Sequence, residues 1–160
     1  MLFRSVAVSG HGYDPDGTLN PRPLTPPEGA RPGCPEGART LLLQAAVLCS
    51  DAEHKQAADG TWEILGDPTE GALSVVALKA GIDDFELRSR FRRAAEIPFS
   101  SERQLMAVWI DDPKGELHAP LGNGASGSRR LLIRKGAPEV IIGLCDRWID
   151  GGGLTPRFGL

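Results

Sequence analysis

Apolar residues recur at helical spacing in two segments of the chain, and a capping aspartate at 83 or 84 and Pro138 indicate two further helices. The longest such segment carries apolar residues at positions 41, 42, 45, 46 and 49, which predicts a largely buried helix. A second helix is expected to begin at Pro68, because Asp67 can cap its N-terminus. The helices predicted in this way cover residues 36–51, 68–80, about 84–92 and 138–144.

Short segments of alternating or β-branched residues lie between these helices. The strands that they predict cover residues 3–9, 61–65, 94–99, 105–110, 130–135 and 147–149. Residues 10–17 are turn formers, residues 20–35 are rich in proline and glycine, and residues 112–129 form a glycine-rich hairpin loop. Strands that are close in sequence, with helices inserted irregularly, indicate an α+β fold with a mainly antiparallel, twisted sheet flanked by helices.

Composition narrows the class of protein. The 160 residues, 41% of them hydrophobic, are enough for one domain that spans residues 1–160. A net charge of -3 favours neither a nucleic acid nor an anionic membrane as a partner. The apolar run 40–49 is too short to span a bilayer, so we expect a soluble chain without membrane contact. Three cysteines without C-x-x-C spacing indicate a reducing, cytoplasmic compartment and neither disulfides nor zinc.

Several catalytic motifs are missing or out of context. Residues 122–127 match G-x-G-x-x-G, but a strand rather than a helix is predicted to follow, so a flexible hairpin loop is the better interpretation. A kinase-like enzyme would also need a catalytic aspartate motif that the chain lacks. Asp14 and Asp16 do not continue into a calcium loop. The sequence therefore predicts neither catalytic residues nor a metal site.

Three motifs occur in order along the chain. They are Gly66-Asp67-Pro68-Thr69-Glu70-Gly71-Ala72-Leu73, Ile97-Pro98-Phe99-Ser100-Ser101-Glu102-Arg103 and Lys135-Gly136-Ala137-Pro138-Glu139. With this order and spacing, the chain resembles the nucleotide-binding domain of P-type cation-transporting ATPases, closest to the branch that includes calcium pumps. The resemblance covers residues 6–150.

The resemblance implies a binding site for the adenosine part of ATP. Phe99 would stack on adenine, Glu70 would accept a hydrogen bond from its amine, and Lys135 would lie beside the base and toward the phosphates. The full set of binding residues implied by the resemblance is Glu70, Phe99, Ser100, Arg103, Gln104, Met106, Lys135, Gly136 and Ala137.

Four of these residues also have a plainer explanation. Phe99 and Met106 could fill the core, and Glu70 could close a capping box with the Asp67 cap. Lys135 could be a solvated surface lysine. However, Gly136 allows close backbone approach, and the helix expected after it directs a positive dipole end toward a ligand.

The resemblance also implies the role of the chain. P-type pumps phosphorylate an aspartate in the sequence Asp-Lys-Thr-Gly-Thr, which is absent here, so we expect this chain to bind ATP without hydrolysing it. Its partners would be the phosphorylation and actuator domains of a parent pump that uses Mg-ATP. An arginine that completes the family's site would lie beyond residue 160.

The alternative is a non-catalytic interaction domain on the same scaffold, with lost or very weak nucleotide binding. Two departures from the family support this alternative. Gln104 stands where the family usually has a lysine, and Ser101 stands where animal calcium pumps often have an arginine.

Overall fold

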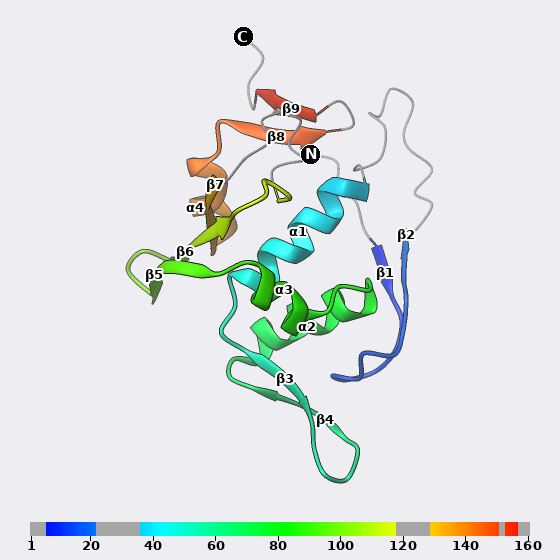
Figure 1. Ribbon diagram of the computed structural model, residues 1–160. Coiled ribbons are helices and arrows are strands. Elements are labelled where there is room, and N and C mark those ends of the chain that lie inside the picture. Colours follow the sequence, from blue (N-terminus) through cyan, green and yellow to red (C-terminus); the bar gives the residue numbers. More distant parts are fainter. Residues whose placement is uncertain (1–5, 22–35, 118–128, 151–152, 157–160) are drawn as a thin grey trace.

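The computed structural model describes residues 6–21, 36–117, 129–150 and 153–156 (Figure 1). Its helices are α1 (Glu36–Leu48), α2 (Pro68–Lys79), α3 (Asp84–Arg90) and α4 (Pro138–Leu144). Its strands are β1 (Val6–Val8), β2 (Leu19–Pro21), β3 (Glu53–Gln56), β4 (Trp62–Leu65), β5 (Arg93–Ser100), β6 (Leu105–Asp112), β7 (Arg129–Gly136), β8 (Arg147–Asp150) and β9 (Gly153–Pro156).

The predicted helices are present, and their N-terminal signals act as expected. The Asp67 carboxylate accepts hydrogen bonds from the backbone amides of Thr69, at 2.8 Å, and Glu70, at 3.1 Å, while Pro68 occupies the first turn of α2. Asp83 caps α3 in the same manner. The first helix ends at Leu48, three residues before the predicted end.

The strands pair in antiparallel fashion throughout the described ranges. β5, β6 and β7 form a three-stranded sheet in that order, and the other strands form the hairpins β1–β2, β3–β4 and β8–β9. This arrangement confirms an α+β fold with a mainly antiparallel sheet. The predicted connection 112–129 joins β6 to its neighbour β7, but residues 118–128, including the G-x-G-x-x-G string, lie outside the described residues.

Two sequence-based expectations about strands were incomplete. The proline-rich connection was expected to begin at residue 20, but residues 19–21 form β2 and residues 22–35 lie outside the described residues. Strand β3 was not predicted, because its sequence Glu-His-Lys-Gln has no apolar alternation. It forms through pairing with β4.

The core lies where α1 packs between the three-stranded sheet and helices α2 and α3 (Figure 1). Ten buried residues form one cluster there: Val47, Leu48, Cys49, Ala77, Leu87, Phe91, Met106, Val108, Ile110 and Leu117. Leu131 and Ile133 of β7 pack against this cluster, so the same face of β6 and β7 covers α1. We call it the inner face of the sheet.

Two side-chain hydrogen bonds link the N-terminal hairpin to other described elements. Lys79 Nζ donates to the Ser9 carbonyl at 2.7 Å, and His54 Nε2 lies 2.7 Å from the Tyr13 carbonyl. In the predicted turn, the Asp14 carboxylate accepts from the amide of Asp16 at 2.8 Å, which is an Asx turn. None of the helices in the described ranges has the length and apolar character needed to cross a membrane.

Candidate functional site

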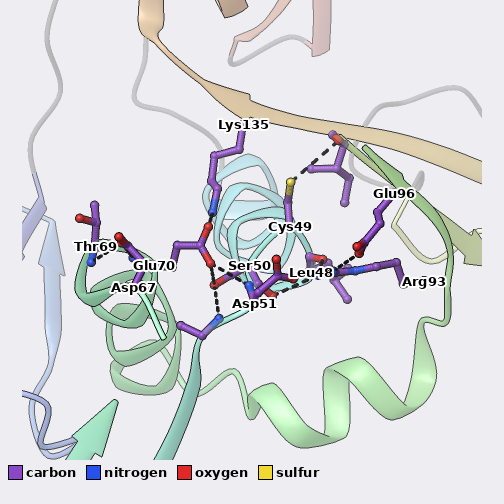
Figure 2. A network of polar contacts seen from close by, with 12 residues as sticks. Leu48, Cys49, Ser50, Asp51, Asp67, Thr69, Glu70, Arg93, Glu96 and Lys135 are labelled. Atoms are coloured by element: carbon purple, nitrogen blue, oxygen red, sulfur yellow. Dashed lines mark hydrogen bonds and ion pairs between the residues drawn. The ribbon is translucent and has the colours of Figure 1, made fainter. Parts of the chain in front are cut away.

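Glu70 lies in the first turn of α2 and accepts hydrogen bonds from two other parts of the chain (Figure 2). One carboxylate oxygen, Oε1, lies 2.6 Å from Lys135 Nζ at the end of β7. The other, Oε2, accepts from the Asp51 amide at 2.7 Å and from the Ser50 hydroxyl at 3.1 Å. The carboxylate of Glu70 therefore bonds these three groups and does not close a capping box with the backbone amide of Asp67.

This environment keeps Glu70 ionised. Burial of the carboxyl alone would raise its pKa, but the hydrogen bonds from Lys135, Asp51 and Ser50 outweigh it, and the net pKa is lowered. The side chains of Glu70 and Lys135 are only 19% and 27% exposed, so their ion pair is more shielded from solvent than an ordinary surface pair. The Glu70 carboxylate, a negatively charged acceptor, is thus held beside the Lys135 ammonium, a positively charged donor.

The segment that supplies Ser50 and Asp51 is itself held by two arginines. Arg93 Nη2 donates to the carbonyls of Leu48 and Ser50, both at 3.1 Å. Arg88 Nη1 donates to the Ser50 carbonyl at 2.8 Å. Carbonyls at the end of α1 that lack a partner within the helix are thereby satisfied by side chains.

The turn between β5 and β6 brings a second group of predicted residues together. The Ser100 carbonyl accepts from the Gln104 amide at 2.8 Å, and Arg103 Nη2 donates to the Pro98 carbonyl at 2.9 Å. Gln104 has a positive φ of 53°, and its carbonyl accepts from the Ala137 amide at 2.9 Å. The turn is thus attached to the loop that opens α4.

Gly136 makes this close approach possible. A Cβ atom at position 136 would lie 2.2 Å from the Gln104 carbonyl oxygen and 2.7 Å from Leu105 Cα. Any larger residue would therefore push β6 and β7 apart at this point. Gly136 thus permits close approach of the β6 backbone, whereas approach of a ligand to this glycine stays a prediction.

Phe99 and Met106 have opposite surroundings. The side chain of Phe99 is 59% exposed at the end of β5, which does not fit core packing. Met106 is 3% exposed and belongs to the core cluster. Because Met106 pairs directly with Lys135 across β6 and β7, it lies next to that lysine on the inner face.

The predicted site residues thus fall into connected groups. Lys135 joins Glu70 directly, and its neighbours Gly136 and Ala137 contact the 100–104 turn. Phe99 adjoins that turn at the end of β5. Two cavities of about 240 and 290 Å³ are lined by other residues, among them Arg90 and Lys114 in one and Leu132 and Ile141 in the other.

Sequence reasoning did not identify the supporting residues Ser50, Asp51, Arg88 and Arg93. Residues 50 and 51 lie outside the three sequence motifs, and arginines at positions 88 and 93 resemble ordinary surface charges. Only the fold brings them to Glu70, across 18 to 23 residues of sequence.

A pH-dependent contribution to stability follows from the lowered pKa of Glu70. A carboxylate with a depressed pKa stabilises the fold above its unfolded pKa, and this contribution is lost as pH falls through the folded pKa. We expect Glu70→Gln to lower the free energy of unfolding by about 1.5–3 kcal/mol at pH 7, and the deficit to shrink in acid. Urea unfolding at several pH values measures it. Glu63→Gln, at an exposed position on β4, is the control, and a deficit independent of pH would contradict the expectation.

Known proteins match this chain over most of its length. A model of the family described as P-type ATPase, cytoplasmic domain N, matches residues 39–156. The chain is 37% identical over 156 residues to the probable cation-transporting ATPase F of Mycobacterium tuberculosis, covering 94% of this chain and 15% of that protein. It is 33% identical over 147 residues to calcium-transporting ATPase 1 of Lactococcus lactis, covering 86% of this chain and 15% of that protein. The chain thus spans about 15% of the length of these relatives.

Proposed function

This chain belongs to the family of P-type ATPase cytoplasmic N domains, and on that premise we propose that it binds the adenosine part of ATP and presents it to a separate phosphorylation domain. The family assignment confirms the resemblance seen in the three sequence motifs. It also agrees with the expected cytoplasmic location, since the family is described as a cytoplasmic domain.

The ion pair of Glu70 and Lys135 is the observation that carries this proposal. A carboxylate has roughly four acceptor positions, and Lys135, Ser50 and Asp51 use three of them. The remaining position suits a ligand that donates a hydrogen bond, such as the exocyclic amine of adenine. Guanine presents a carbonyl oxygen at the equivalent atom, which an ionised Glu70 would repel. The site therefore favours adenine.

The parent protein is, in this proposal, an ATP-driven cation pump of the P-type class. The relatives are named as cation-transporting and calcium-transporting ATPases, and this chain spans a small part of each. Its partners are the phosphorylation and actuator domains of that pump, which uses Mg-ATP. The contribution of this chain to catalysis is positioning of the nucleotide, because the sequence Asp-Lys-Thr-Gly-Thr is absent from residues 1–160.

Titration of the labelled chain with ATP, followed by NMR shifts, tests the proposal. We expect weak binding, with a Kd of about 1 mM, because the site offers stacking and a few polar contacts. GTP should bind less tightly, and no phosphate should be released above a control without protein. Absence of any shift near Glu70 and Lys135 would favour the non-catalytic interaction domain. Phosphate release that survives repurification would contradict the positioning role.

Gln104 allows a second test, because it replaces the positive charge that the family usually has at this position. Without that charge, ATP, ADP and AMP should bind within a few-fold of one another. Gln104→Lys should strengthen binding of ATP over AMP by at most about 1 kcal/mol, since the position is exposed and screened. Titrations of both proteins with both nucleotides at low and high salt measure the effect. An equal gain for ATP and AMP, or a gain that survives high salt, would show that residue 104 does not face the phosphates.

A further inference from the structure

Arg93 donates four hydrogen bonds within the polar network around the candidate site (Figure 2). Its Nη1 donates to the Asp51 carboxylate at 2.6 Å and to the Glu96 carboxylate at 2.7 Å, while its Nη2 donates to the carbonyls of Leu48 and Ser50. The side chain is 25% exposed. One guanidinium therefore satisfies four acceptors on two segments of the chain.

The segment held by Arg93 is the one that orients Glu70. Ser50 donates its hydroxyl, and Asp51 its backbone amide, to the same oxygen of Glu70. Ser50 itself is fully buried. A shift of the 48–51 backbone would therefore move both donors together, and the Glu70 carboxylate with them.

Arg93 is also the first residue of β5, the strand that carries Phe99 near its other end. Its contacts with Leu48, Ser50 and Asp51 thus attach the start of that strand to the segment that holds Glu70. The two groups proposed to contact adenine, Phe99 and Glu70, lie on β5 and α2 respectively. Arg93 links Phe99 to Glu70, because it belongs to the same strand as Phe99 and its side chain donates hydrogen bonds to the 48–51 segment, which contacts Glu70.

We propose that Arg93 is a positioning residue for adenine recognition, which acts through the 48–51 backbone to fix the orientation of Glu70. This inference rests on the proposed function of the site. Arg93 does not touch the nucleotide. Replacing Arg93 therefore changes the contact between Glu70 and the adenine amine, because Glu70 is the group proposed to distinguish adenine from guanine.

Arginine suits this role for a geometric reason. The planar guanidinium offers donors in fixed directions, so it binds the Asp51 carboxylate and two carbonyls at the same time. A lysine keeps the positive charge but has a single nitrogen, which cannot reproduce the fork. Arg93→Lys therefore removes the geometry while it largely retains the charge.

The experiment compares Arg93→Lys with Arg130→Lys in the 160-residue chain. Arg130 also pairs with a carboxylate, that of Asp111, but it lies on the exposed part of β7 near the opposite end of the strand from Lys135. We expect Arg93→Lys to weaken ATP binding by about fivefold and GTP binding by less than about twofold. Arg130→Lys should change neither. Equal weakening for both nucleotides, or none, would overturn the inference.

A double-mutant cycle with Glu70→Gln tests whether Arg93 acts through Glu70. If it does, Arg93→Lys should change ATP affinity by less than about twofold once Glu70 has been replaced. If its effect is the same in both backgrounds, Arg93 does not act through Glu70 and the inference is wrong. General loss of structure would appear as a lower melting temperature in every background.

A readout without nucleotide separates this inference from the proposed function. In Arg93→Lys, hydrogen exchange of the Asp51 amide should accelerate relative to Arg130→Lys, since that amide donates to Glu70. Unchanged exchange would overturn the inference even if ATP binds as proposed. Faster exchange in a chain that fails to bind ATP would refute the proposed function alone. If Arg93→Lys does not fold, Asp51→Asn can be used instead, because it weakens the hydrogen bond between Arg93 and residue 51. It should reduce the preference for ATP over GTP in the same direction, but by a smaller factor.

Discussion

Replacing Phe99 with alanine is expected to weaken nucleotide binding by at least about fivefold while leaving the fold intact. Stacking of an aromatic ring on a base contributes about 1–3 kcal/mol, and no other aromatic residue belongs to the predicted site. Stability should change little, because the Phe99 side chain is 59% exposed and loses few contacts on truncation. NMR titration with ATP and a thermal melt of the same sample measure the two effects.

Phe85 provides the matched control. It is 82% exposed on α3, outside the predicted set, so Phe85→Ala removes an even more exposed ring without touching the proposed site. Its ATP affinity should equal that of the native chain. A stability loss of roughly 3–5 kcal/mol in Phe99→Ala would instead indicate a core role for this ring, and unchanged affinity would place adenine elsewhere.

The second large effect is expected at Gly136. The methyl group of Gly136→Ala would overlap the Gln104 carbonyl oxygen and Leu105 Cα, so the backbones of β6 and β7 must separate. Overpacking of this kind costs about 1–3 kcal/mol or more. The hydrogen bond from the Ala137 amide to the Gln104 carbonyl should be weakened at the same time, along with nucleotide binding. Chemical denaturation and the NMR shift of the Ala137 amide report these changes.

Gly143 is the control for this substitution. It lies in α4, where an added Cβ would meet nothing within 4 Å. Because alanine is the better helix former, Gly143→Ala should be neutral or should stabilise the chain by about 0.5–1 kcal/mol. If both substitutions had the same effect, the close approach at Gly136 would not be what limits residue size there.

The helices could be predicted from the sequence because their signals are local. Asp67, Pro68 and Asp83 act within one turn of their own helix, so no tertiary information is needed to interpret them. Strand β3 lacked such a signal, since its four residues are polar and its structure depends on pairing with Trp62–Leu65. Local patterns could not reveal it.

The candidate site was predicted residue by residue but not as an arrangement. The ion pair of Glu70 and Lys135 joins positions 65 residues apart, and no spacing rule predicts it. The positive φ of Gln104 was also unexpected, because residues other than glycine rarely adopt that conformation. Arg93 illustrates the same limit, since its four acceptors become visible only after the 48–51 segment and β5 have been placed together.

Strand β5 is an edge of the three-stranded sheet in the described part of the chain, and it exposes Ile97 and Phe99. An exposed apolar edge can template pairing with another molecule and so promote aggregation. Two features oppose this. Pro98 lacks a backbone N–H, and the pairing of β5 with β6 shifts register between Ile97 and Ser100. The irregularity next to Phe99 therefore lets the strand expose an apolar ring while making it a poor template for self-association.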